Sequence, residues 1–164
     1  MTDAVGRGPV TAWRVFRAVH LSTAFSGSGA ARHGGRFNPA GRAAVYAADS
    51  LALALLETLV HLKPEDSLAR FAAVRLNLDP VLIEDAGPDL PPDWRTDEAA
   101  TRRFGGEWLA SGRSAALRVP PAVLPFPTDE ANYVLNPAHP NFGTLILDPP
   151  VLFRFDPRLF AAGG

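Results

Sequence analysis

The stretch "GGRFNPAGRAAVYAADSLALALLETLVHL" (residues 34–62) joins a polar loop, a short strand and an apolar helix without a break. Residues 44–47 are expected to form the strand, which carries Tyr46. Ser50 is suited to cap a helix that runs to residue 62. Leucines on two neighbouring stripes predict that this helix packs on both sides, and Glu57 falls inside one stripe. A carboxylate buried there is costly unless a cation and hydrogen-bond donors surround it.

Two more elements are expected close to this segment. Residues 13–16 read as a first strand, and the glycine-rich residues 22–41 form a loop that is too long to be a simple connector. The glycines match neither GxGxxG after a strand nor GxxxxGK[ST], so a Rossmann or P-loop phosphate site is excluded. Residues 71–78 alternate as a strand does.

The C-terminal half mixes helix and strand signals. Residues 79–94 read as a proline-rich surface excursion, and residues 97–111 as a second helix with Phe104, Trp108 and Leu109 facing inward. Short strands and turns alternate after that helix. Because helices and strands do not alternate regularly, we expect an α+β fold in one compact domain over residues 1–164, with residues 1–10 poorly ordered.

Composition narrows the classes of function. The chain has 16 Lys and Arg against 17 Asp and Glu, without a basic block, which argues against nucleic acid as a direct partner. It has no cysteine, which excludes disulfides and thiolate chemistry. No leader or membrane span is visible, so a cytoplasmic location without membrane attachment is expected. The histidines lack ligand spacing, so we expect no metal site and structural roles for His20, His33, His61 and His139.

Three polar residues in residues 34–62 suit one chemistry. Arg36 offers planar donors for a phosphate, Tyr46 a ring for a flat heterocycle, and Glu57 a carboxylate for developing positive charge. Cleavage of an N-glycosidic bond needs these parts, because its transition state is oxocarbenium-like. The structural alternative is a buried ion pair between Arg36 and Glu57 beside a core tyrosine, and the pattern alone does not separate the two.

Four blocks in order carry a resemblance to a known family: "AWRVFRA", residues 34–62, "NYVLNPAHPNF" and "RFDPRLF". The chain resembles the RES domain, named for Arg, Glu and Ser, over nearly its whole length. The resemblance implies a fold like that of ADP-ribosyltransferases, with a small, split mixed sheet flanked by helices. It also implies a toxin of a bacterial toxin–antitoxin system, neutralised by an Xre-like helix-turn-helix antitoxin, and it leaves a homodimer within that complex open.

The resemblance further implies NAD+ as the substrate, cleaved at the nicotinamide–ribose bond by hydrolysis or phosphorolysis, without a metal. The alternatives are ADP-ribosylation of a host protein and a catalytically inactive binding module. By position, Arg36 would grip a phosphate of NAD+, Tyr46 would orient the nicotinamide end, and Glu57 would stabilise the ribose. We expect Arg36 to be the counter-charge of Glu57 when the site is empty.

One position departs from the family pattern. Pro121 stands where the family usually has its serine, and proline has neither a hydroxyl nor an N–H. Ser114 and Asn132 are candidates to supply a polar group to the substrate instead, against ordinary roles as turn or cap residues. Arg14 matches an early aromatic–Arg pair of the family and is a candidate second phosphate contact, against an exposed strand charge.

Overall fold

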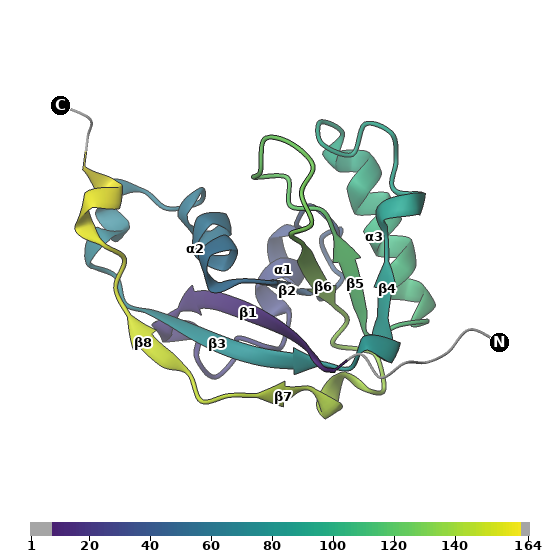
Figure 1. Cartoon of the computed structure of the whole chain (residues 1–164), viewed down its shortest axis with the longest axis horizontal. Helices are drawn as coiled ribbons and strands as arrows, with labels where there is room; N and C mark the ends of the chain where they lie inside the picture. The colour runs from purple at the N-terminus through teal and green to yellow at the C-terminus, as the bar shows by residue number, and fades with distance from the viewer. Residues whose placement is uncertain (1–7, 162–164) are drawn as a thin grey trace.

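A computed structural model describes residues 8–161 as one mixed sheet with helices packed on it (Figure 1). The strand order is β4-β5-β6-β2-β1-β3-β7, and β8 also pairs with β3. The strands are β1 (Val10–Arg17), β2 (Val45–Ala48), β3 (Phe71–Leu78), β4 (Ile83–Asp85), β5 (Ala116–Val119), β6 (Asn132–Leu135), β7 (Ile146–Leu147) and β8 (Val151–Phe153). The α-helices are α1 (Ser28–His33), α2 (Leu51–Leu59) and α3 (Glu98–Ser111).

Short 3-10 turns join several of these elements. They cover Ala18–His20, Pro64–Leu68, Pro80–Leu82, Gly87–Asp89, Phe142–Thr144 and Pro157–Phe160. The expected α+β fold with a split mixed sheet is confirmed. The expectation for the N-terminus falls mostly on residues 1–7, which lie outside the described residues, whereas Val10 already belongs to β1.

The sheet is split between β1 and β2. These strands pair only at Trp13 and Ala48, whereas β1 pairs with β3 at eight positions. Arg14 bridges the gap: its Nε donates to the carbonyl of Ala24 at 2.7 Å and its Nη1 to the carbonyl of Tyr46 at 2.8 Å. The guanidinium therefore satisfies a β2 carbonyl that a strand ladder would otherwise satisfy.

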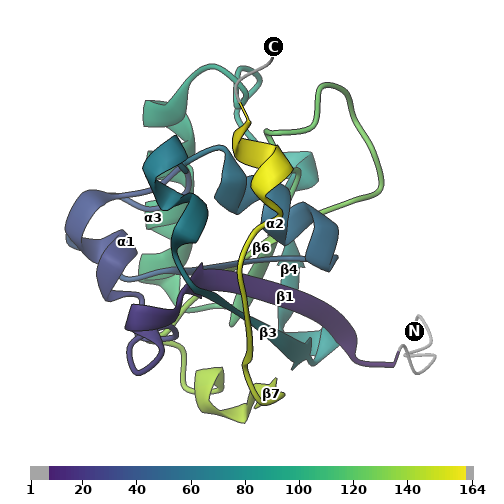
Figure 2. The same cartoon turned by 90° about the vertical axis from the view of Figure 1, so that its left-hand side faces the viewer.

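Both longer helices pack on the same face of the sheet, as Figures 1 and 2 show from two directions. α2 covers Trp13 and Val15 of β1 through Leu53 and Ala54. The buried residues of α3, Trp108 among them, pack on β5 and β6. The opposite face of the sheet holds a separate core of Ala12, Val45, Leu76, Leu78, Ala116, Tyr133 and Leu135. The space between α2 and α3 is where the cavity described below lies.

Helix α2 differs from its sequence-based prediction. Its N-cap is confirmed, since Ser50 Oγ accepts from the N–H of Leu53 at 3.1 Å, but the helix ends at Leu59. Packing on both sides is wrong: Leu51, Leu56 and Val60 are 37, 38 and 56 % exposed. The physical reason is that one face of α2 rests on the sheet and no described element covers the other.

Two other segments also depart from the prediction. Residues 79–94 contain β4, which pairs parallel with β5, so the segment is not only a surface excursion. The long loop of residues 22–41 contains the short helix α1. The second helix is confirmed as α3, with Asp97 as its N-cap.

Gly105 explains how α3 comes close to the loop that carries Arg36. A Cβ at Gly105 would lie 1.9 Å from the carbonyl oxygen of Phe37, so no other residue fits without moving one of the two backbones. Glycine inside a helix costs about 1 kcal/mol relative to alanine, and here it allows a backbone contact that holds α3 against this loop. Two residues of α3 near its start, Glu98 and Arg102, reach the cavity as a result.

Candidate active site

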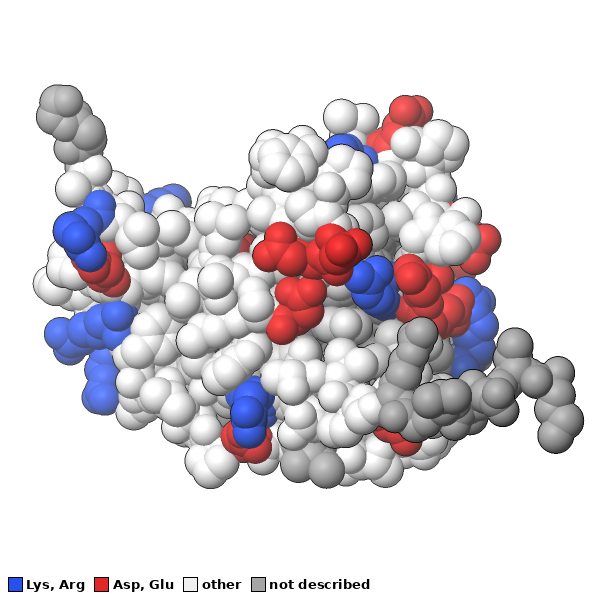
Figure 3. Space-filling model, viewed as in Figure 1, with Lys and Arg blue, Asp and Glu red and all other residues white. Residues whose placement is uncertain are grey.

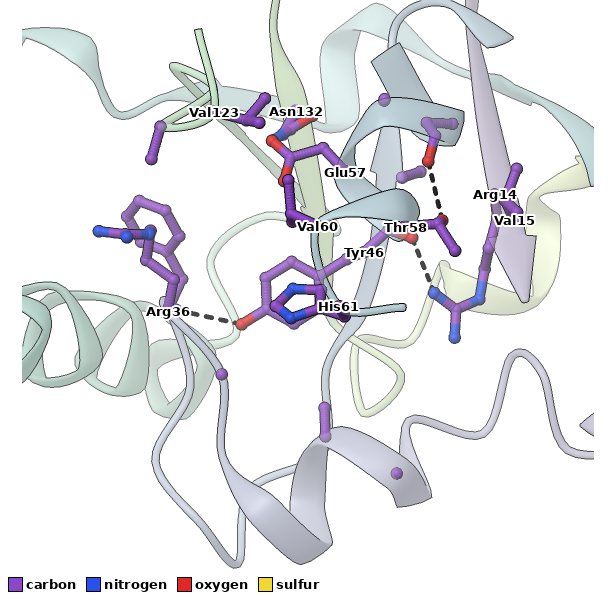
Figure 4. A pocket seen from close by; sticks show the side chains of 18 of the residues that line it. Arg14, Val15, Arg36, Tyr46, Glu57, Thr58, Val60, His61, Val123 and Asn132 are labelled. Atoms are coloured by element: carbon purple, nitrogen blue, oxygen red, sulfur yellow. Dashed lines mark hydrogen bonds between the residues drawn. The ribbon is translucent and has the colours of Figure 1, made fainter. Parts of the chain in front are cut away.

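A cavity of about 850 Å³ opens between α2, the loop of residues 34–37 and the split between β1 and β2. Its volume is within the range of about 300–1,000 Å³ that is usual for small-molecule sites. Figure 4 shows Arg36, Tyr46 and Glu57 arranged around it, with Asn132 beside Glu57 and Arg14 on the far side. The structure therefore brings together all the sequence-predicted site residues except Ser114.

Glu57 is held by Asn132. The Nδ2 of Asn132 on β6 donates to Oε1 of Glu57 at 2.6 Å. The Oδ1 of Asn132 is buried and has no hydrogen-bond partner among the described residues. Because the amide occupies only one carboxylate oxygen of Glu57, the side chain is oriented in the cavity without being neutralised.

Arg36 is not the counter-charge of Glu57, which corrects our expectation. No salt bridge to Glu57 occurs within the described residues. Arg36 Nη1 instead donates to the carbonyls of Trp94 and Arg95 at 3.2 and 3.4 Å, and its Nη2 lies 3.6 Å from Glu98. The physical reason is that the segment before α3 offers backbone acceptors to Arg36, whose guanidinium points away from Glu57 (Figure 4).

Tyr46 is fixed by hydrogen bonds that leave its ring to line the cavity. Its hydroxyl donates to Asn38 Oδ1 at 2.7 Å and accepts from the N–H of Phe37 at 3.1 Å. Burial raises the pKa of Tyr46, so the hydroxyl stays protonated and keeps its role as a donor. Gly35 is required beside it, since a Cβ there would lie 2.7 Å from the Tyr46 hydroxyl.

Asn38 was missed from the sequence although it organises this loop. It is fully buried, and its Nδ2 donates to the carbonyls of Ala30 and Arg42, both at 2.9 Å. The signal was present as an Asn-Pro pair in the loop "FNPAG", a sequence typical of turns. Glu98 and Arg102 were also missed, because they lie on a helix far from residues 34–62 in the chain.

Arg14 is a partly buried cation. No carboxylate lies within salt-bridge distance of it among residues 8–161, and desolvation by burial lowers its pKa to about 10, so it remains charged at neutral pH. It is thus not an exposed strand charge. Two of its three nitrogens are used by the carbonyls that it bridges across the split.

Neither Ser114 nor Pro121, the residue at the family serine position, lines the cavity. Ser114 does not line the cavity: its hydroxyl accepts from Trp108 Nε1 at 2.7 Å and donates to Glu84 at 3.1 Å. Pro121 is buried, and its neighbours Ala122 and Val123 line the cavity in its place. Of the histidines, His33 and His61 line the cavity and are exposed.

Charged groups elsewhere do not suggest another kind of site. On the face in Figure 3, acidic side chains gather near the middle with arginines beside them, and the described residues there form no extended basic patch. Within residues 8–161, no group of three or more His, Asp or Glu side chains is placed to hold a metal ion. None of the helices in that range is long and apolar enough to cross a bilayer.

The arrangement combines a carboxylate without a cationic partner, an aromatic ring and arginines in one cavity. The model of the RES domain family matches residues 11–156. The chain belongs to the RES domain family. Two relatives called Toxin Res support this. One from Yersinia enterocolitica is 39 % identical over 151 residues, which cover 90 % of this chain and 97 % of the relative. One from Photorhabdus laumondii is 36 % identical over 154 residues, which cover 92 % of this chain and 97 % of the relative. Both of these relatives are toxins by name, and each is matched over nearly its whole length.

Two further similarities are informative. The Prs ADP-ribosylating toxin of Sphingobium sp. is 37 % identical over 155 residues, covering 90 % of this chain and 94 % of the relative. The toxin in the crystal structure of the Mycobacterium tuberculosis MbcT–MbcA toxin–antitoxin complex is similar in fold, with a TM-score of 0.68 at 20 % identity, over 93 % of this chain and 87 % of the other. The RES fold of this chain is thereby confirmed.

Proposed function

We propose that this RES-domain toxin consumes NAD+ by breaking the nicotinamide–ribose bond in the cavity between α2 and α3. The observation that carries the proposal is the position of the Glu57 carboxylate and the contacts that it makes. Its carboxylate lines a cavity of suitable volume, is oriented by the neutral amide of Asn132 at 2.6 Å, and has no salt bridge within residues 8–161. Because the group that holds Glu57 is a neutral amide, the negative charge of the carboxylate remains available to a bound substrate.

The chemistry follows from that geometry. When the bond between ribose C1′ and the nicotinamide nitrogen breaks, its electron pair goes to nicotinamide and positive charge develops on the ribose. A unit charge about 4 Å from a carboxylate gains about 4 kcal/mol at an effective dielectric constant of 20, which corresponds to roughly a thousandfold in rate. The Tyr46 ring offers a flat apolar surface for the nicotinamide end, and Arg36 offers donors for a phosphate.

The test is release of nicotinamide by purified protein. Glu57→Gln keeps a polar side chain of the same size and should lower the rate by about a hundredfold to a thousandfold without changing the melting temperature. Glu65→Gln is the matched control, because Glu65 is exposed and lies outside the cavity. A Glu57→Gln variant as active as the parent would show that Glu57 is not catalytic. A parent that releases no nicotinamide would favour the inactive module.

ADP-ribosylation of a protein is the second candidate, and the similarity to the ADP-ribosylating toxin of Sphingobium favours it. Water, phosphate and a protein side chain can each attack the same ribose carbon once nicotinamide has left. Mass spectrometry of the products, with and without phosphate, separates the three outcomes. ADP-ribose indicates hydrolysis, ADP-ribose phosphate indicates phosphorolysis, and a modified protein indicates transfer.

An antitoxin partner is part of the proposal. The toxin–antitoxin complex that is similar in fold supports it. The partner is an Xre-like helix-turn-helix protein, and the complex contains a toxin homodimer. Sedimentation of the toxin alone and with such a partner measures both, and a toxin that stays monomeric in the complex would exclude the homodimer.

A further inference from the structure

The lining of the cavity contains a glutamate between two arginines. The Oε1 of Glu98 lies 3.6 Å from Arg36 Nη2, and its Oε2 lies 3.3 Å from Arg102 Nη2. All three side chains line the cavity, yet Arg36 comes from the loop before β2 while the other two come from α3. The carboxylate of Glu98 therefore occupies a position at which donors from separate elements of the chain converge.

Each arginine is also held without Glu98. Arg102 Nε donates to the carbonyl of Gly35 at 2.9 Å, and Arg36 Nη1 donates to the carbonyls of Trp94 and Arg95. These partners are neutral, so they orient the two guanidinium groups without cancelling their charge. The close contact between Gly105 and Phe37 fixes α3 beside the loop, and thereby the spacing of the two arginines.

We propose that Arg36 and Arg102 together bind the diphosphate group of the substrate, and that Glu98 occupies this site when it is empty. The identity of the ligand as NAD+, and of its anionic group as a diphosphate, rests on the proposed function, whereas binding of an anion follows from two preoriented guanidinium groups at one position. Arg102 is thus a substrate-binding residue in addition to Arg36, and Glu98 competes with the substrate.

The exposure of the cluster makes the exchange feasible. The Glu98 side chain is 54 % exposed, and its distances of 3.3 and 3.6 Å to the arginines are long for charge-assisted hydrogen bonds. A diphosphate brings more charge and more acceptor oxygens than one carboxylate, and it pairs with guanidinium groups in bidentate geometry. Glu98 can swing into solvent as the diphosphate enters, because more than half of its side chain is already in water.

The experiment measures binding of two probes, NAD+ and inorganic pyrophosphate, by NMR titration of the full chain. Glu98→Gln should tighten binding of both about two- to fivefold, as expected for loss of a surface charge pair. Arg102→Ala should weaken binding of both about tenfold. Glu107→Gln is the control, since Glu107 is an exposed glutamate of α3 outside this cavity, and it should bind as the parent does. Melting temperatures verify that each variant is folded.

Two results would overturn the proposal: weaker pyrophosphate binding by Glu98→Gln, which would make Glu98 a residue that positions Arg36, or unchanged binding by Arg102→Ala. Failure of the proposed function is distinguishable, because nicotinamide release is measured separately. If pyrophosphate affinity falls in the order Glu98→Gln, parent, Arg102→Ala, but the parent releases no nicotinamide, the anion site stands and the proposed reaction fails. If nicotinamide is released but the variants do not show this order of affinities, the reaction stands and the assignment of the anion site fails.

Discussion

The cavity is bordered by two arginine-containing regions that differ in how they hold the charge. At the split between β1 and β2, Arg14 is partly buried and bonded to two backbone carbonyls at 2.7 and 2.8 Å. On the α3 side of the cavity, Arg36 is also partly buried, but its backbone bonds are 3.2 and 3.4 Å long and a glutamate lies 3.6 Å away. The first arginine replaces missing strand pairing, whereas the second is loosely held and free to exchange partners. Residue type alone therefore does not distinguish a structural arginine from a binding one.

After Glu57→Gln, the largest expected effect is on stability, from Arg14→Leu. This change leaves the carbonyls of Ala24 and Tyr46 without their donors, which should cost about 3 kcal/mol and lower the melting temperature by about 6–12 °C. Thermal denaturation measures it. Arg75→Leu on β3 is the matched control, because its only salt bridge within residues 8–161 is a half-exposed pair with Asp148, and it should cost less than about 1 kcal/mol. If Arg14→Leu melts like the parent but binds NAD+ poorly, Arg14 belongs with the binding arginines.

Asn132→Ala should have the next largest effect. Without the amide at 2.6 Å, Glu57 loses its orientation in the cavity, and kcat for nicotinamide release should fall about thirtyfold with little change in KM. Steady-state kinetics measure the two constants separately. Asn77→Ala on β3 is the control, since that asparagine lies outside the cavity. A rise in KM with unchanged kcat would instead mean that Asn132 contributes equally to binding the ground state and the transition state.

Arg36→Ala should raise KM about tenfold through lost contacts to phosphate, with kcat within about threefold of the parent. Because Arg36 does not pair with Glu57, the melting temperature should change by less than about 3 °C. Arg32→Ala is the control, as Arg32 is an exposed residue of α1 outside the cavity. If Arg36→Ala lowers the melting temperature but leaves KM unchanged, Arg36 has a structural role, as Arg14 does.

The smallest effect is expected for Pro121→Ser, which restores the serine of the family pattern. The side chain at this position is buried and does not line the cavity, so nicotinamide release should stay within about threefold of the parent. Ser114→Ala should likewise keep its activity, but should lose some stability because Trp108 and Glu84 lose a partner. A clear gain of activity in Pro121→Ser would show that this segment moves toward the substrate.

The predictability of the fold varied along the chain. Residues 71–78 were predicted as a strand and form β3. The prediction succeeded because the alternation of apolar and polar residues is a local signal and turns flank the segment on both sides. The start of the helix after Ser50 was predicted correctly, because its cap is a local interaction. The helix itself ends at Leu59, before the predicted end at residue 62. Strand β4 was missed in a proline-rich segment, since its pairing with β5 depends on residues more than 30 positions away.

The sequence by itself determined the family, the α+β class and the presence of Arg36, Tyr46 and Glu57 in one short span, since local patterns and ordered motifs carry that information. Only the tertiary structure decided which side chains meet: Glu57 with Asn132, 75 residues away, and Arg36 with Glu98 rather than Glu57. The physical reason is that these contacts depend on the split of the sheet and on the close approach of α3 at Gly105. Both are properties of packed backbones, which no local pattern specifies.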